Sequence, residues 1–352
     1  MIHLQEKIQS IVRRAIAEKV FPGCVIGIVN REGERNVWAF GNYTYDQSSA
    51  PMQADSIFDV ASITKLVPTS LLILQLIERG KLNLDDLISK YLPEITSHAG
   101  RIATIKHLLT FTYLVNTGQH LSTFKHLPAG EILSMLFSVE TIFPPGTHFQ
   151  YSNTPSIFLG LIAERVTGMP LPQLAQTFLF DPLEMFTTTF EPQKYPLSRI
   201  VPTEIDTWRG TVQGVVHDEA SWALQKSFYP GCAGVFSTND DLLNCMWMLL
   251  NQGKYHHTKI LSAQMIEQMF TNQLGPIQAN HGLGIELNQP QYMGIHCQDM
   301  FGKTGFTGTV CLGSLKKGLA AVIFTNRCYP TRPLNGDSIN HFRANISTSI
   351  FT

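Results

Sequence analysis

Ser62 and Lys65 stand three residues apart in segment 59–65, shortly before a long apolar run at 71–77. Residues at positions i and i+3 of a helix share one face, so the Lys65 ammonium can lie beside the Ser62 hydroxyl. A helix that begins at Ser62 would add free N–H groups and a positive dipole end, which favour an anion. The segment therefore predicts a serine nucleophile with a neighbouring base and the beginning of an oxyanion hole.

Two further stretches carry residues of the same chemical kind. Tyr151-Ser152-Asn153 follows a Pro-Pro-Gly turn at 144–146, and Lys303-Thr304-Gly305 stands at the start of a predicted strand. Each stretch also has an ordinary structural interpretation. Ser62 and Asn153 suit helix N-caps, Tyr151 suits the interior with a satisfied hydroxyl, and Lys303 suits a solvated turn.

The order Ser-x-x-Lys, Tyr-x-Asn and Lys-Thr-Gly resembles the three active-site signatures of class C β-lactamases and related penicillin-recognising serine hydrolases. The resemblance spans nearly the whole chain. Further segments similar to family landmarks lie at 21–23, 82–86, 91–94, 104–110, 234–238 and 302–309. One departure is Phe111-Thr-Tyr-Leu-Val, where the family often has a small polar loop.

The resemblance implies a role for each of these residues. Ser62 attacks an acyl carbonyl, and Lys65 and Tyr151 take its proton and return one to the leaving group. Lys303 keeps the surroundings of Tyr151 positive and attracts a substrate carboxylate. The resemblance also implies that Asn153, Thr304, Gly305 and Phe306 contact the substrate. The backbone N–H groups of Ser62 and Phe306 would form the oxyanion hole.

Two chemical expectations accompany this assignment. Two neighbouring ammonium groups should lower the pKa of Tyr151 from about 10 towards a range useful for a base. His217 and Asp218 allow an alternative Ser-His-Asp triad with Ser62. No Gly-x-Ser-x-Gly motif surrounds Ser62, which argues against an α/β-hydrolase.

Composition limits the class of protein. The 352 residues are 44% hydrophobic and 15% charged, below the usual charged share of about 25%, which indicates a large core. The net charge of −1 and the scattered basic residues indicate no nucleic-acid surface. No apolar run of about 18 residues, as needed for a membrane span, is apparent.

The first residues form a charged amphipathic pattern without a signal-peptide core, which predicts a cytoplasmic protein, or a periplasmic one if a leader was removed. The six cysteines show no metal-ligand spacing and should be buried thiols. Neither a cofactor nor a metal is expected, and His256-His257 is a weak metal candidate only.

Apolar periodicity indicates the elements of the chain. Helical patterns occur at 3–19, 82–92, 105–109, 129–137, 157–166, 242–250, 262–272 and from about 339. Strand patterns occur at 24–29, 37–40, 282–287, 309–313 and 319–325. Pro68 should bend the helix after Ser62 or delay its regular start.

Strands at both ends with helices between them predict an α+β fold of the β-lactamase and transpeptidase type. We expect one catalytic domain over 1–352, with an α/β lobe at about 1–60 plus 220–352 and a helical lobe at about 61–219. The sheet should be antiparallel and flanked by the terminal helices.

The resemblance implies a serine hydrolase that forms an acyl-enzyme on Ser62. Because Lys303 places an ammonium near the acyl pocket, amides or β-lactams that carry a carboxylate are expected first, as in D-alanyl peptides. The substrate would be a small molecule or a short peptide. An intracellular carboxylesterase is one alternative, and a catalytically idle relative that binds a ligand in the cleft is another. The oligomeric state is open.

Overall fold

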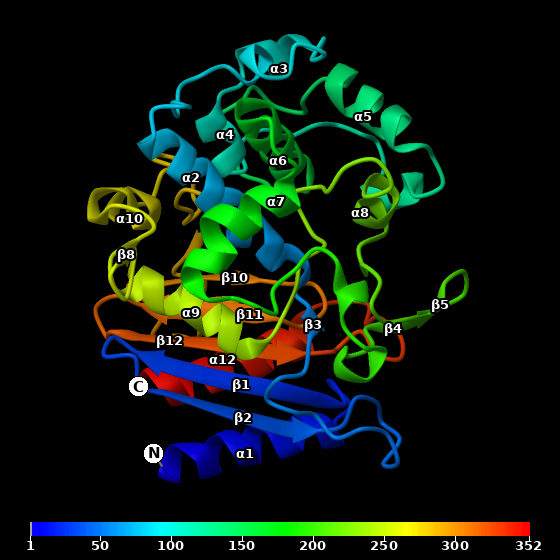
Figure 1. The fold of residues 1–352 in the computed structure, drawn as a ribbon, viewed down its shortest axis with the longest axis vertical. Helices are drawn as coiled ribbons and strands as arrows, with labels where there is room; N and C mark the ends of the chain where they lie inside the picture. The colour runs from blue at the N-terminus through cyan, green and yellow to red at the C-terminus, as the bar shows by residue number, and fades with distance from the viewer. Residues whose placement is uncertain (1) are drawn as a thin grey trace.

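A six-stranded antiparallel sheet, in the order β2-β1-β12-β11-β10-β9, joins the two ends of the chain in the computed structural model, which describes residues 2–352 (Figure 1). Its strands are β1 (Gly23–Asn30), β2 (Arg35–Gly41), β9 (Glu286–Leu287), β10 (Met300–Thr304), β11 (Val310–Ser314) and β12 (Leu319–Thr325). The N-terminal hairpin β1–β2 pairs with β12 along seven residues. The sheet therefore depends on both termini.

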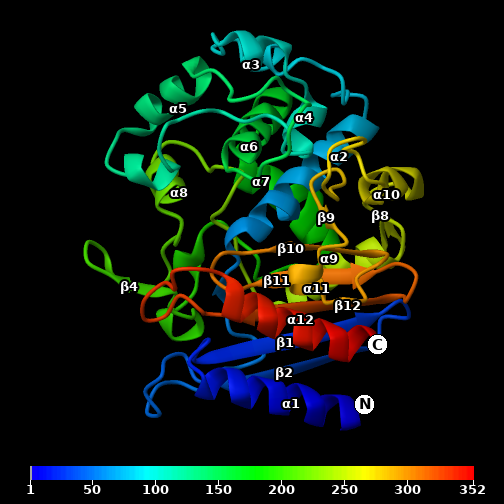
Figure 2. The ribbon, with the colours of Figure 1, turned by 180° about the vertical axis from the view of Figure 1, so that it is seen from behind.

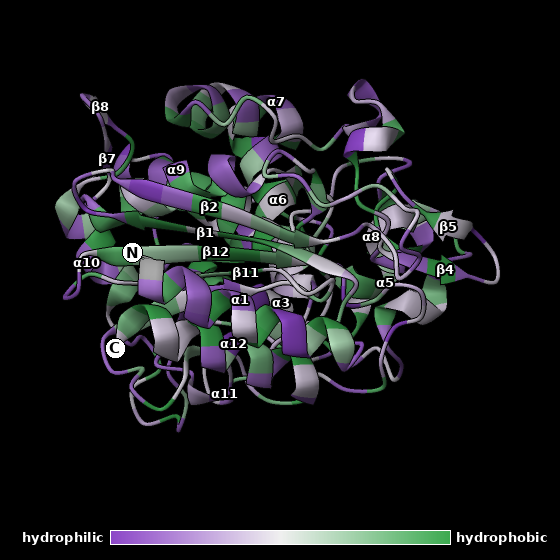
Figure 3. Cartoon of the chain, turned by 90° about the horizontal axis from the view of Figure 1, so that it is seen from below, coloured by the Kyte–Doolittle hydropathy of each residue, from purple (hydrophilic) through white to green (hydrophobic). Residues whose placement is uncertain are grey.

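Alternation along the central strands sends apolar side chains to both faces of the sheet. On one face, Ile26 and Ile323 pack with the terminal helices α1 (Ile2–Ala17) and α12 (Asp337–Phe351). Figure 2 shows these two helices beside the sheet. On the other face, Val25 and Val322 belong to a larger core shared with α9 (Asn239–Leu250) and the helical block. Seen from below, the strands are mostly hydrophobic, whereas α1 and α12 carry polar bands (Figure 3).

The remaining helices gather above the sheet in Figure 1. They are α2 (Leu71–Glu78), α3 (His98–Ile102), α4 (Ile105–Leu109), α5 (Ala129–Ser138), α6 (Thr154–Thr167), α7 (Leu171–Ala175), α8 (Glu219–Leu224) and α10 (Ala263–Phe270), with α11 (Pro290–Met293) beside α12. Three short antiparallel pairs complete the fold, β3 (Phe58–Asp59) with β6 (Phe236–Ser237), β4 (Glu204–Asp206) with β5 (Gly210–Val212), and β7 (Lys254–Tyr255) with β8 (Thr258–Lys259). The α+β prediction is confirmed.

The segment after Ser62 is not one regular helix. A 3-10 turn over Ala61–Lys65 leads into a wide turn over Leu66–Ser70, and regular α2 begins only at Leu71. This is the delayed start that Pro68 predicts, since proline removes a backbone donor. Together these turns make Ala61–Glu78 long and apolar enough to cross a membrane, contrary to the sequence expectation, but most of this stretch is buried in the core.

Other elements differ from the sequence pattern. The predicted helix at 82–92 is reduced to a 3-10 turn at Ile88–Lys90, because the apolar side chains anchor an irregular segment against the core. The predicted strand at 282–287 pairs only at its last two residues, since Gly284 has a left-handed backbone. The sequence pattern does not predict strand β10, which carries Lys303 near its end. The six cysteines are buried free thiols, as predicted.

A close approach between β1 and α9 predicts a measurable effect on stability. A Cβ added at Gly27 would lie 2.0 Å from Asn239 Oδ1, and this Asn239 side chain donates to the carbonyls of Val25 and Val322. Gly27→Ala should therefore lower the free energy of unfolding by about 1–3 kcal/mol in denaturant titrations. Gly130→Ala, in α5 with nothing within 4 Å of the new Cβ, should raise it by about 0.5–1 kcal/mol. Equal effects of the two variants would contradict this packing.

Candidate active site

The Ser62 and Lys65 side chains lie in direct contact. Lys65 Nζ donates to Ser62 Oγ at 2.9 Å and to the carbonyl of Cys232 at 2.9 Å. The two residues lie on the 3-10 turn, where three residues complete a turn and side chains at i and i+3 eclipse one another. The local backbone therefore aligns the amine with the hydroxyl more directly than the α-helix expected from the sequence.

Burial lowers the pKa of the Lys65 amine. Lys65 is fully buried, and desolvation lowers its pKa, with partial opposition from nearby negative groups at Asp218 and Glu286. A lowered pKa makes the neutral amine more accessible near neutral pH. Lys65 is thus suited to accept the Ser62 proton.

The turn that presents Ser62 is strained and is held by a buried carboxylate. Ala61, directly before Ser62, has a φ of +47°, in the left-handed region that side chains disfavour. Asp59 Oδ1 accepts the Ala61 N–H at 2.8 Å. Asp59 Oδ2 accepts the His217 N–H at 2.7 Å, which connects this turn to a distant segment. Apart from the position of Asp59 beside the motif, nothing in the sequence indicates this role.

Ser62 opens into a cavity of about 410 Å³. Five other residues that the sequence placed at the site also line it, namely Tyr151, Asn153, Thr304, Gly305 and Phe306. Lys65 and Lys303 are fully buried and do not line the cavity. The structure thus brings all three motifs together at this cavity. Their two lysines are buried beneath the residues that line it.

Tyr151 lies close to both lysines. Its ring centroid is 5.1 Å from Lys65 Nζ and 4.2 Å from Lys303 Nζ. The residue as a whole is 42% exposed, but its acidity depends on the surroundings of the hydroxyl oxygen, where burial dominates. Burial raises the pKa of Tyr151, and the opposing charge of Lys303 does not reverse this. The expected lowering of the Tyr151 pKa is therefore wrong.

Lys303 is engaged by a carboxylate that the sequence reasoning missed. Its Nζ lies 2.6 Å from Glu286 Oε1, and the Tyr292 hydroxyl donates to the other oxygen of Glu286 at 2.8 Å. Glu286 is on β9, which pairs with β10 and places Glu286 opposite Gly302, the residue next to Lys303. Although burial opposes ionisation, Lys303 holds the pKa of Glu286 below its usual value. The pair neutralises the ammonium that was expected to attract a substrate carboxylate.

Asn153 directs its amide towards a neighbouring acid. Its side chain provides no helix cap, although it stands at the N-cap position of α6. Instead Asn153 Nδ2 donates to Asp218 Oδ2 at 3.3 Å, and Asp218 caps α8 through Ser221. Asn153 also lines the cavity, and no described residue donates a hydrogen bond to its side-chain oxygen, so this oxygen is available to an amide substrate.

Two backbone amides complete the site. Among the described residues, neither the Ser62 N–H nor the Phe306 N–H donates to a protein acceptor, and both residues line the cavity. A buried amide normally has a partner, so free amides around a nucleophile suit an oxygen that becomes negative during reaction. They are the pair that the resemblance implies for the oxyanion hole.

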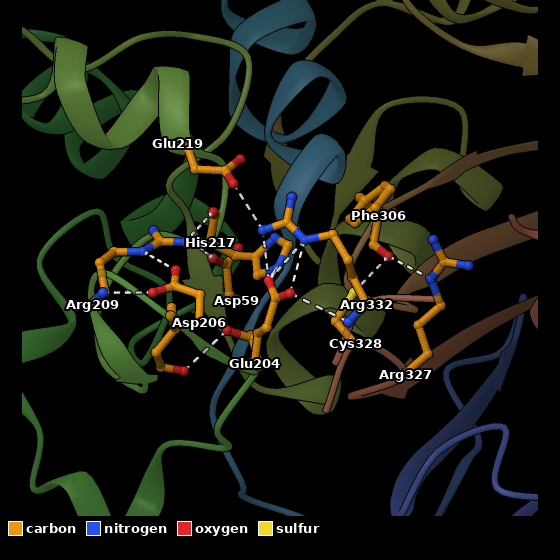
Figure 4. Close-up of polar contacts among 12 residues, drawn as sticks. Asp59, Glu204, Asp206, Arg209, His217, Glu219, Phe306, Arg327, Cys328 and Arg332 are labelled. Atoms are coloured by element: carbon orange, nitrogen blue, oxygen red, sulfur yellow. Dashed lines mark hydrogen bonds and ion pairs between the residues drawn. The ribbon is translucent and has the colours of Figure 1, made fainter. Parts of the chain in front are cut away.

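His217 lies in a buried ionic network and not in a triad (Figure 4). Its Nε2 contacts Glu204 Oε2 at 2.8 Å, and Arg332 bridges Glu204 and Glu219. Burial opposes the charge of His217, but Cys328 and Glu204 outweigh it and raise its pKa to about 10. An imidazolium cannot take a proton from Ser62 near neutral pH, so the alternative triad is wrong.

No group of three or more His, Cys, Asp or Glu side chains within residues 2–352 is arranged to hold a metal ion. His256 instead packs edge-on against Trp247 and Tyr255.

Comparison with known proteins agrees with this geometry. The family model for beta-lactamase matches residues 8–345. A relative from Salmonella paratyphi A, named "Putative D-alanyl-D-alanine carboxypeptidase", is 28% identical over 345 residues, covering 87% of this chain and 78% of the relative. A relative with the same name from Salmonella typhimurium is also 28% identical, with the same coverage.

Solved structures show the same fold. "EstCE1, a hydrolase with promiscuous acyltransferase activity" has a TM-score of 0.78 at 22% identity, covering 99% of this chain and 98% of its own. The octameric penicillin-binding protein homologue from Pyrococcus abyssi has a TM-score of 0.72 at 22% identity, covering 91% and 73%. The fold and the family match define a serine hydrolase. The chain belongs to the beta-lactamase family.

The buried ion pair of Lys303 and Glu286 predicts a stability effect. Glu286→Gln should lower the free energy of unfolding by about 3–5 kcal/mol, because it leaves a buried ammonium without its counter-charge. Lys303→Met in the same chain should restore part of that loss. Asp299→Asn, which breaks the exposed pair with Lys316, should change stability by less than about 1 kcal/mol. A Glu286→Gln effect as small as this control would contradict the pairing.

The His217 network predicts a pH-dependent contribution to stability. The pKa of His217 rises from 6.5 to about 10, so its contribution is complete below pH 6.5 and is lost as the pH rises to 10. Burial opposes the ionisation of Glu204, but hydrogen bonds from His217 and Arg332 lower its pKa from 4.5 to about 2, so that contribution is lost as the pH falls through this range. In thermal unfolding, the Tm of wild type should exceed that of Glu204→Gln most between pH 4.5 and pH 6.5. The difference in Tm should shrink above pH 6.5. A constant advantage up to pH 10 would contradict the network.

Proposed function

We propose that this serine hydrolase cleaves acyl compounds through a covalent acyl-enzyme on Ser62. The observation that carries the proposal is the 2.9 Å contact between the buried Lys65 amine and the Ser62 hydroxyl. Ser62 Oγ bonds to the acyl carbon while Lys65 takes its proton, and the developing oxyanion is bound by the Ser62 and Phe306 amides. An idle ligand-binding relative would not need this alignment.

Collapse of the tetrahedral intermediate breaks the bond between the acyl carbon and the leaving group. The leaving amine takes a proton from Tyr151, whose raised pKa keeps it protonated, and Lys65 can restore the proton on Tyr151. Water then attacks the acyl-enzyme and regenerates Ser62. Asn153 orients the amide on the acyl side of the substrate.

We place substrates with a carboxylate on the leaving group first, as in a peptide that ends in D-alanine. The relatives named as D-alanyl-D-alanine carboxypeptidases support this choice. The cavity supports it as well, because Arg327 and Arg343 line it and neither forms an ion pair within the described residues. Both are largely buried, and desolvation together with Arg327 lowers the pKa of Arg343 to about 9. An anion would relieve this repulsion.

A carboxylesterase is the second candidate, and one observation favours it. Lys303 is paired with Glu286 and lies behind the cavity wall, so the ammonium that would mark a preference for carboxylates is not offered to the substrate. An ester of neutral charge does not need the Lys303 ammonium. Charge on the leaving group therefore separates the two candidates.

Matched substrates test this choice. For a short peptide ending in D-alanine, kcat/KM should exceed that of its C-terminal amide by about 10- to 100-fold, the usual value of a hydrogen bond between charged partners. Ser62→Ala should remove turnover of both while circular dichroism and thermal unfolding stay unchanged. Equal kcat/KM for acid and amide, with faster hydrolysis of a p-nitrophenyl ester, would replace the first candidate by the esterase.

A further inference from the structure

The Phe306 peptide is held by the segment that follows β12. Arg327 Nε donates to the Phe306 carbonyl at 2.7 Å, and Cys328 Sγ approaches the same oxygen at 3.6 Å (Figure 4). The Arg327 N–H also donates to the Thr307 carbonyl at 3.1 Å. Three donors from two adjacent residues thus fix the turn that follows Gly305.

The Phe306 ring is held by two cations, although Phe306 is 46% exposed. The Arg327 guanidinium lies 4.8 Å from the ring centroid, and the His217 ring stacks on it at 5.7 Å with an interplanar angle of 23°. Cations over an aromatic face are attracted by its quadrupole. The contacts to the Phe306 ring and to the Phe306 carbonyl together restrict both backbone dihedrals of this residue. They therefore restrict the direction of the Phe306 N–H.

Asp59 connects this turn to the turn that carries Ser62. Thr307 Oγ1 donates to the Asp59 carbonyl at 2.8 Å, while the Asp59 carboxylate accepts the N–H groups of Ala61 and His217. The two free amides of the site therefore stand on turns that share one buried anchor. Arg327 and His217 contact Phe306, on the second of these two turns.

We propose that Arg327, with Cys328 and His217, is a positioning device for the Phe306 N–H, the second donor of the oxyanion hole. This inference rests on the proposed acyl-enzyme function. Arg327 acts through Phe306 and contacts no reacting atom. Because an oxyanion hole works by donors fixed before the charge appears, loosening one donor lowers the rate of the chemical step more than it weakens substrate binding.

Kinetics on a neutral p-nitrophenyl ester test the proposal, since a substrate without charge removes any direct attraction to Arg327. Arg327→Lys and Arg327→Gln should lower kcat by about 10- to 100-fold with KM changed less than about twofold. A boronic acid that binds Ser62 as a tetrahedral adduct should lose affinity in parallel with kcat/KM. Arg165→Gln, which breaks an ion pair with Glu94 on the helical side, should leave all three values unchanged.

Cys328 provides a milder pair of variants in case the Arg327 variants unfold. Cys328→Ala removes the sulfur and should lower kcat severalfold, whereas Cys328→Ser keeps a donor and should stay near wild type. Unchanged kcat in both Arg327→Lys and Cys328→Ala would overturn the proposal. So would a higher KM for the neutral ester with kcat unchanged, because Arg327 would then support ester binding and not the oxyanion. Loss of the proposed function itself would show differently, as wild type that hydrolyses neither the ester nor the peptide ending in D-alanine.

Discussion

The buried amine of Lys65 is the constraint on which the rest of the site depends. An ammonium with no exposed surface is costly to desolvate, and here it has a hydroxyl and one carbonyl as partners. That cost lowers the pKa of Lys65 and suits it to the proposed role of base for Ser62. The surrounding structure must therefore exclude water from Lys65 while it leaves Ser62 open to a cavity, and the two layers of the fold achieve this separation.

The sheet and the helical block meet at the active site. β10 supplies Lys303 and Thr304, the helical block supplies Tyr151 and Asn153, and the turn at 61–65 lies between them. Buried acidic residues hold the site in place, since Asp59 anchors the turns that carry both free amides and Glu286 pairs with Lys303 within the sheet. In the proposed mechanism, catalysis depends on the burial of Lys65 and on the fixed amides, while the Tyr151 hydroxyl serves in proton transfer.

The sequence predicts the chemistry of the site better than its electrostatics. Ser-x-x-Lys, Tyr-x-Asn and Lys-Thr-Gly each keep their spacing within one turn or strand, so local geometry and order along the chain suffice to find them. Glu286 and Glu204 lie 17 and 13 residues from the partners they charge, and only the folded sheet and the β4–β5 hairpin bring them there. The pKa of Tyr151 was mispredicted because burial, which the sequence does not show, outweighs the charge of Lys303.

The central claim is that Ser62 carries the acyl group, and its most direct test is the location of that group. The protein would be mixed with a penicillin, quenched in acid during turnover, and analysed by intact mass and peptide mapping. We predict one added penicilloyl group, on the peptide that contains Ser62, and none in Ser62→Ala. A mapped adduct on another residue, or turnover with an adduct that persists in Ser62→Ala, would contradict the account.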